Sequence, residues 1–226
     1  MRKIWTGLSL LFLIIFNFQC AASPQYWTYH QGNIPSHISH VQYIPVWIDA
    51  AFTPPQVEEF KAAITEWNYV FNGQIVIYLA TRSALGTDKK MHQYPITFAG
   101  WDAGQAIVKQ CDKTGSGWVI LSILAGDPKL QAVGAPEGTL AYVEGEGAHS
   151  IVVVIDRFGV RSLKDVTMHE MAHLFGALHV NNPSLENPYY GNNQYDCIDK
   201  ETVLQVASQQ HLDFTSLSYC VTPNEI

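Results

Sequence analysis

The chain carries little positive charge and has no long hydrophobic run. Thirteen Lys and Arg residues stand against twenty Asp and Glu residues among 226, which gives a formal net charge of −7 at pH 7. A surface of this sign argues against nucleic acid or an anionic membrane as a partner. The one extended apolar run, residues 8–16, is too short to span a membrane, which needs about 20 residues. We therefore expect neither a membrane span nor a nucleic-acid partner.

The short apolar run is typical of a secretory leader. Two basic residues precede it at positions 2–3 and small residues follow at positions 21–23, which is the pattern of a signal peptide and its cleavage site. The sequence thus predicts a signal peptide over 1–22, a single domain over 23–226 and a secreted, extracytoplasmic protein. Lipid anchoring through Cys20 is an alternative, but Gln19 stands where lipoprotein signals usually carry a small residue.

Cysteine is also scarce, with four in the chain. If Cys20 leaves with the leader, the remaining three are an odd number for an oxidising compartment. Cys197 and Cys220 bracket the last helical segment and could form a disulfide there. Cys111 would then remain as a free, buried thiol.

Residues 169–179 read HEMAHLFGALH, which is HExxHxxGxxH. On an α-helix, residues four apart lie about 40° from eclipsed and one turn apart, so His169 and His173 can bind one metal ion. Glu170 lies about 100° around the helix from His169, where it can reach a water molecule at the metal and act as a general base. Gly176 can end the helix with a positive φ. His179 can then reach the metal from the other side.

The helix that carries this motif has a predicted start as well as a predicted stop. Ser162 and Asp165 form a capping box of the [ST]-x-x-[DE] type. Apolar residues can supply a buried side, namely Leu163, Val166, Met171, Leu174 and Phe175.

This stretch resembles the signature of the metzincin clan of zinc endopeptidases. The resemblance is strong over about residues 160–190 and only architectural elsewhere. It implies a catalytic Zn²⁺ bound by His169, His173 and His179, with Glu170 as general base and acid and Gly176 as the turn.

The sequence departs from the metzincin pattern after the motif. Metzincins carry a later methionine in a tight turn beneath the metal, but no methionine follows His179 here. Residues 184–190 resemble that turn, with Glu186 in the methionine's place. A carboxylate there could coordinate the metal, orient an imidazole from the second coordination sphere, or point to solvent. Tyr189 and Tyr190 follow, and one of them could wall the substrate pocket or donate to the oxyanion, or each could simply be packed or exposed.

The remaining pattern predicts strands over 41–52, 74–80, 118–124, 139–143 and 150–156, and a helix from Pro54 to about residue 72. The unbroken apolar run over 150–156 indicates a strand buried on both faces. Residues 112–117 and 125–138 read as surface loops, 23–41 as an exposed arm, and Asp199 as the cap of a last helix.

By the metzincin resemblance, this order implies an α+β fold. It would have a twisted, mixed five-stranded sheet, two long helices and a small C-terminal subdomain with a third helix. The edge strand around Ala141 and Tyr142 would pair with an extended substrate.

These patterns together predict a secreted, monomeric zinc endopeptidase that acts on a peptide or protein substrate. Glu170 would take a proton from water that attacks the peptide carbonyl. Two alternatives remain at this stage. One is a secreted zinc-binding interaction module that has lost catalysis, and the other is a zinc hydrolase of a non-peptide amide.

Overall fold

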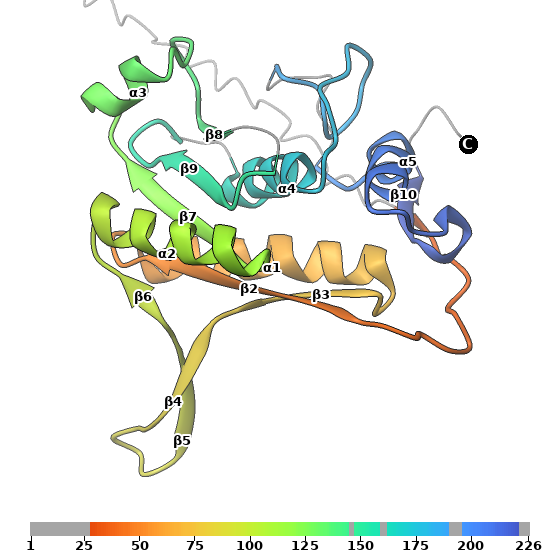
Figure 1. The fold of residues 1–226 in the computed structure, drawn as a ribbon, viewed down its shortest axis with the longest axis horizontal. Coiled ribbons are helices and arrows are strands. Elements are labelled where there is room, and N and C mark those ends of the chain that lie inside the picture. The colour runs from red at the N-terminus through yellow and green to blue at the C-terminus, as the bar shows by residue number, and fades with distance from the viewer. Residues whose placement is uncertain (1–27, 145–146, 159–161, 190–195, 222–226) are drawn as a thin grey trace, which may run out of the picture.

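The structure is a computed structural model that describes residues 28–144, 147–158, 162–189 and 196–221 (Figure 1). The predicted leader with Cys20, and Tyr190 at the candidate site, lie outside these residues. The described part is an α+β fold with five α-helices and a mixed sheet. In this part, no helix has the length and apolar character needed to cross a membrane.

The central sheet has six strands, one more than the sequence predicts. Its strand order is β3-β2-β7-β9-β8, with β6 paired to β2. The strands are β2 (Gln42–Asp49), β3 (Ile75–Leu79), β6 (Thr97–Phe98), β7 (Trp118–Ile123), β8 (Ala141–Val143) and β9 (Ser150–Val154). All pairs are parallel except β8 with β9, so β8 is an antiparallel edge strand. The sixth strand, β6, has two residues, too few to show a period in the sequence.

Strand β9 is buried on both faces, as its apolar run predicts. Ile151 and Val153 belong to the main core, which also contains residues of α1 (Pro54–Phe71), α4 (Leu163–Leu174) and α5 (Lys200–Gln209). Val152 and Val154 belong to a second core that contains residues of α2 (Trp101–Thr114). Because successive strand residues point to opposite faces, helices cover both sides of the sheet.

The predicted architecture with two long helices is wrong, because α2 is an additional long helix that precedes β7. Gly104, Val108 and Cys111 are buried on one face of this helix, and Trp101 and Ile107 pack against the same core. An apolar face at helical spacing was thus present in the sequence but was not recognised. The predicted loop 112–117 includes the last turn of this helix, which ends at Gly115 with φ +65°. The predicted loop 125–138 likewise contains a short helix, α3 (Pro128–Ala132), capped by Asp127.

Two more pairs of strands lie outside the central sheet. β4 (Thr81–Leu85) and β5 (Met91–Pro95) form a hairpin that extends away from the rest of the chain (Figure 1). Most of its side chains are exposed, so it lacks the alternation that would have marked it. β1 (Thr28–His30) pairs with β10 (Tyr219–Val221), and the His30 ring stacks on Tyr219. The described residues of the predicted arm are thus mostly exposed, as expected, but the first three are held in a strand pair.

The C-terminal part is closed by a disulfide between Cys197 and Cys220, the pairing that the sequence allows. It comprises α5, a 3-10 helix (Phe214–Ser216) and β10. Cys111 is a free, buried thiol, as expected, and burial raises its pKa.

Candidate metal centre

Helix α4 begins where the capping pattern predicts. Ser162 is its N-cap residue, and the Ser162 hydroxyl accepts a hydrogen bond from Asp165 N at 3.2 Å. The Glu59 carboxylate of α1 accepts two more, from Leu163 N at 2.6 Å and Lys164 N at 3.1 Å. An acidic group at a helix N-terminus also complements the helix dipole. The start of the motif helix is therefore fixed by α1 as well as by its own cap.

Aromatic packing fixes the rest of α4 against α1 and the sheet. The Trp67 indole N–H donates to the Met168 carbonyl at 3.2 Å. The Phe175 ring packs against Trp67, Phe71 and Trp118, with centroids 4.8–5.3 Å apart. These rings are fully or almost fully buried. The turn that leads to His179, the third motif histidine, thus packs on the buried aromatic core.

Gly176 ends the helix and reverses the chain. Its φ is +91°, a value that a residue with a Cβ rarely adopts. Gly176 N donates to His173 O at 2.9 Å, and Ala177 N donates to Ala172 O at 2.9 Å. His179 therefore returns toward the helix, as the spacing predicts.

A Gly176→Ala variant tests this turn. The new Cβ would meet Gln209 Cγ at 2.9 Å in addition to the strained φ, so we expect a loss of about 1–2 kcal/mol of folding stability and weaker Zn²⁺ binding. Thermal unfolding and Zn²⁺ titration measure both effects. Gly126→Ala is the matched control, because its Cβ would meet open space. Unchanged Zn²⁺ affinity in Gly176→Ala would show that the turn does not position His179.

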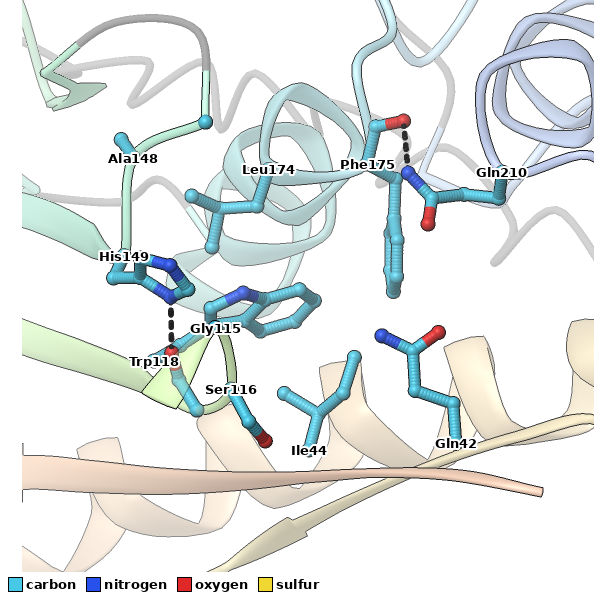
Figure 2. A pocket seen from close by; sticks show the side chains of 12 residues that line it. Gln42, Ile44, Gly115, Ser116, Trp118, Ala148, His149, Leu174, Phe175 and Gln210 are labelled. Atoms are coloured by element: carbon cyan, nitrogen blue, oxygen red, sulfur yellow. Dashed lines mark hydrogen bonds between the residues drawn. The ribbon is translucent and has the colours of Figure 1, made fainter. Parts of the chain in front are cut away.

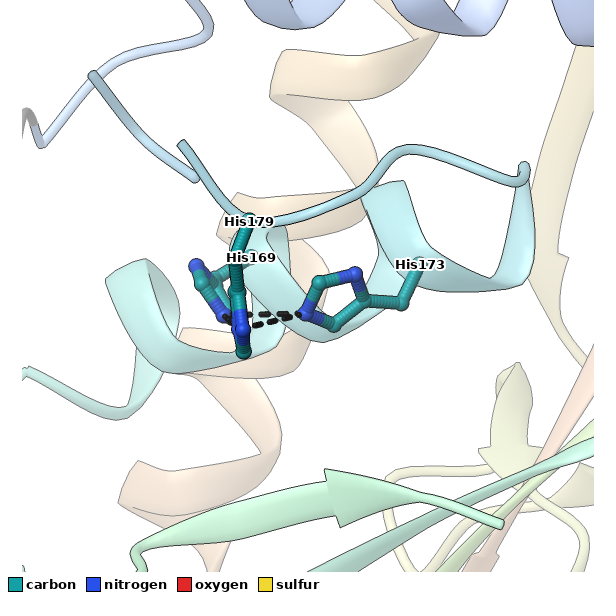
Figure 3. A group of neighbouring side chains, drawn as sticks. All are labelled: His169, His173 and His179. Atoms are coloured by element: carbon teal, nitrogen blue, oxygen red, sulfur yellow. Dashed lines mark hydrogen bonds between the residues drawn. The ribbon is translucent and has the colours of Figure 1, made fainter. Parts of the chain in front are cut away.

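The three motif histidines converge on one point (Figure 3). Their Nε2 atoms are 3.1 Å apart for His169 and His173, 3.2 Å for His169 and His179, and 3.0 Å for His173 and His179. In a tetrahedral zinc site with Zn–N bonds of 2.0–2.1 Å, ligand nitrogens lie about 3.3 Å apart. The three imidazoles are thus close enough to bind one metal ion, and the donor set and spacing fit zinc.

Hydrogen bonds on the far side of the rings orient two of these imidazoles. His169 Nδ1 lies 2.7 Å from the Leu185 carbonyl oxygen, and His173 Nδ1 lies 2.8 Å from the Ala177 carbonyl oxygen. A carbonyl oxygen can only accept, so each Nδ1 carries the proton. In a neutral ring, Nε2 is then a lone-pair donor that faces the other two.

The electrostatics favour neutral rings. Burial, reinforced by the neighbouring His173, lowers the pKa of His169 to about 3. Burial also lowers the pKa of His173 and of His179. Neutral imidazole is the form that ligates metal, so the site does not have to lose protons from these rings before a cation binds.

Glu170 lies beside the three histidines but is not one of the candidate metal ligands. Its side chain is 5% exposed and lines the cleft that contains the histidines. Among the described residues, only the three histidines form a group of donor atoms close enough for one metal ion. Burial raises the pKa of Glu170 to about 8. A carboxyl group whose pKa is raised this far, and which lies beside a candidate metal site, suits proton transfer near neutral pH.

Glu186 lies beneath the histidines. Its carboxylate oxygens are 3.7 Å from His169 Nδ1 and 3.3 Å from His173 Nδ1, and the side chain is fully buried. Neither oxygen has a hydrogen-bond partner in the described part of the chain. Burial, together with the charges of Glu170 and Asp199, raises its pKa well above the usual value. The alternative in which Glu186 points to solvent is therefore wrong, because the turn that carries it packs under α4.

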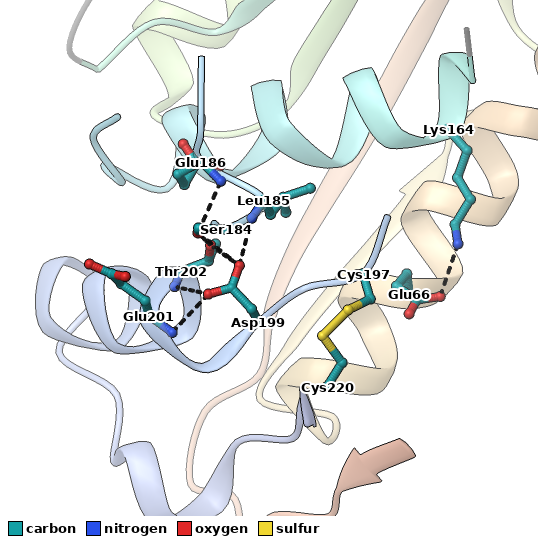
Figure 4. The surroundings of a disulfide bond; sticks show 10 residues. All are labelled: Glu66, Lys164, Ser184, Leu185, Glu186, Cys197, Asp199, Glu201, Thr202 and Cys220. Carbon is teal, nitrogen blue, oxygen red and sulfur yellow. Dashed lines mark hydrogen bonds and ion pairs between the residues drawn. A yellow bond between two sulfur atoms is a disulfide. The ribbon is translucent and has the colours of Figure 1, made fainter. Parts of the chain in front are cut away.

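Asp199 holds that turn in place (Figure 4). Its buried carboxylate caps α5 by accepting from Glu201 N and Thr202 N, as the sequence predicts. The same carboxylate accepts from Ser184 Oγ at 2.9 Å and from Leu185 N at 2.7 Å. One side chain thus connects the C-terminal helix to the loop whose carbonyl orients His169.

The loop also binds the segment that carries the third histidine. Val180 N donates to Glu186 O at 3.1 Å, and Glu186 N donates to Ser184 Oγ at 3.2 Å. Residues 184–187, which we call the brace loop, are all buried. The brace loop therefore positions both His169 and the chain next to His179.

A cleft runs past the histidines along the edge strand. Ala141 and Tyr142 of β8 line it, together with Pro188 and Tyr189. Tyr189 is 78% exposed. The Tyr142 hydroxyl is buried and has no hydrogen-bond partner among the described residues, and burial raises its pKa to about 12. The cleft thus brings together the described substrate-binding residues that the sequence suggested.

A separate, smaller pocket lies at the end of α4 (Figure 2). It is lined by Trp118, Leu174 and Phe175 together with polar groups such as His149 and Gln210. His149 Nδ1 lies 2.7 Å from Gly117 O, and Gln210 Nε2 donates to Phe175 O at 3.0 Å. Both of these side chains thus hydrogen-bond the backbone of neighbouring segments.

The sequence matches no protein-family model and no curated protein. The function of the chain must therefore follow from its own side chains and their geometry.

Three contributors to the site were not foreseen from the sequence. Glu59 caps α4 from another helix, Leu185 orients His169 through its backbone, and Asp199 reaches the brace loop in addition to its own helix. The cap at Asp199 has a sequence signal. The other contacts are tertiary, and no local pattern marks them.

Proposed function

We propose that this protein is a secreted zinc-dependent endopeptidase of metzincin type. The observation that carries the proposal is the convergence of three Nε2 lone pairs, with two of the rings oriented from behind by backbone carbonyls. Closely facing lone pairs repel one another unless a cation lies between them. The pattern at residues 1–22 supports secretion.

The residues of the cleft suit amide hydrolysis. Bound zinc would supply Lewis acidity toward a water molecule and the scissile carbonyl. Glu170 accepts the proton of the attacking water and passes it to the leaving amine. The edge strand β8 offers unpaired backbone groups to an extended peptide, an interaction that requires little sequence preference.

Metal removal and restoration test the proposal. We expect purified protein to contain about one zinc ion per chain and to cleave members of a peptide library. A chelator should abolish cleavage, and added Zn²⁺ should restore it. Mass spectrometry identifies the cleaved bonds, and elemental analysis gives the metal content.

Three other results would point to a different function or contradict the proposal. Tight Zn²⁺ binding without cleavage of any peptide would indicate a binding module. Cleavage confined to non-peptide amides would indicate a different hydrolase with the same centre. Protein that binds no divalent metal would contradict the proposal altogether.

A further inference from the structure

We propose that the Glu186 carboxylate is the buried counter-charge of the metal centre, raising the affinity of the three histidines for a divalent cation without coordinating it. The inference rests on the metal-binding part of the proposed function. It makes Glu186 a positioning residue that acts through electrostatics and through the rings above it.

The first support is the side of the rings on which Glu186 lies. Its oxygens approach the Nδ1 atoms of His169 and His173, whereas the Nε2 atoms converge on each other across the rings. Each Nδ1 already donates to a backbone carbonyl. The carboxylate therefore lies behind the ligands, and the Nε2 side keeps a coordination position open for water.

The second support is the absence of any other compensation for this carboxylate. Both oxygens lack a hydrogen-bond partner among the described residues, although the side chain is fully buried. Among the described residues, the charged groups that act on it most are Glu170 and Asp199, and both are acidic. Burying an uncompensated carboxylate is costly. A divalent cation held by neutral imidazoles is the charge that would offset this cost.

The third support is that hydrogen bonds hold the backbone around Glu186 in place. The backbone of Glu186 donates to Ser184 Oγ and accepts from Val180 N, and Asp199 holds the neighbouring Leu185 N. These bonds fix the backbone that carries the carboxylate, and the side chain itself is fully buried. Its place beneath the rings is therefore a property of the fold.

Replacement of Glu186 tests the proposal in three measurements. Glu186→Gln keeps the shape and removes the charge, and Glu186→Met also removes the polar atoms. We expect both variants to bind Zn²⁺ about 10–100-fold more weakly than the unmodified protein, measured by competition with a chromophoric chelator. We also expect the metal-free variants to unfold at the same temperature as the unmodified protein or higher, because a buried unsatisfied group is gone. The rise in unfolding temperature on adding Zn²⁺ should be smaller.

A control variant and a spectroscopic measurement distinguish this role from direct coordination of the metal. Glu137→Gln is the matched control, because Glu137 is an exposed carboxylate of the same cleft; its Zn²⁺ affinity should not change. The visible spectrum of bound Co²⁺ should be alike in Glu186→Gln and the unmodified protein, because the ligand set stays the same. A changed spectrum would make Glu186 a ligand and overturn the proposal.

Equal Zn²⁺ affinity in Glu186→Gln and the unmodified protein would also overturn it. So would a metal-free Glu186→Gln that fails to fold, since a counter-charge is not required for folding. The counter-charge role of Glu186 and the proposed endopeptidase activity can be refuted independently. Protein that binds Zn²⁺ through Glu186-dependent affinity but cleaves nothing refutes only the endopeptidase.

Discussion

A Glu170→Gln variant should lose about 10²–10⁴-fold in kcat/KM toward a cleaved peptide while it keeps its zinc. Glutamine fills the same space but cannot accept a proton from water. The metal content should not change, because Glu170 lies outside the group of ligating histidines. Steady-state kinetics and elemental analysis on the same preparation give both values. Glu58→Gln, at an exposed position of α1 outside the cleft, should retain full activity.

The same variant has a second consequence for stability in the metal-free protein. The pKa of Glu170 is raised to about 8 on folding from an ordinary 4.5, so the folded state holds its proton more tightly than the unfolded state. The contribution of Glu170 to stability is therefore fully present below pH 4.5 and is lost as pH rises toward 8. Thermal unfolding of Glu170→Gln should show a shallower fall over this range. A variant that kept more than a tenth of the original kcat/KM would show that Glu170 is not the proton acceptor.

The second large effect is expected for Asp199→Ala. The carboxylate accepts from Ser184, Leu185, Glu201 and Thr202, and its loss leaves several buried donors unsatisfied. We expect a decrease of about 3–5 kcal/mol in the free energy of unfolding. Zn²⁺ affinity should also fall by about tenfold or more, because the Leu185 carbonyl would no longer be held against His169. Denaturant unfolding and Zn²⁺ competition measure the two losses.

Asp213→Ala is the matched control for this prediction. Asp213 is also an aspartate N-cap, but it is exposed and caps the 3-10 helix, where it accepts from Thr215. Its removal should cost about 1 kcal/mol and leave Zn²⁺ affinity unchanged. If Asp199→Ala were destabilised but bound Zn²⁺ as tightly as the unmodified protein, the brace loop would have no role in orienting His169.

Much of the local structure was predictable because its signals lie close together in the sequence. The caps at Ser162 and Asp199, the turn at Gly176 and the doubly buried strand β9 each follow from the types of a few adjacent residues. Helix α2 was missed although its buried residues Gly104, Val108 and Cys111 recur at helical spacing. The β4–β5 hairpin was missed because it is mostly exposed on both faces. Weak burial leaves a weak period in the sequence.

For the candidate site, the sequence by itself determined which three histidines come together. Helical spacing and one glycine suffice to bring His169, His173 and His179 together, since all three lie within eleven residues of chain. Only the tertiary structure decided what surrounds them. Glu186 could have coordinated, supported or faced solvent, and its burial beneath the rings depends on Asp199 and on packing against α4. Contacts of this kind join residues whose spacing in the sequence has no fixed period, so no local pattern could reveal them.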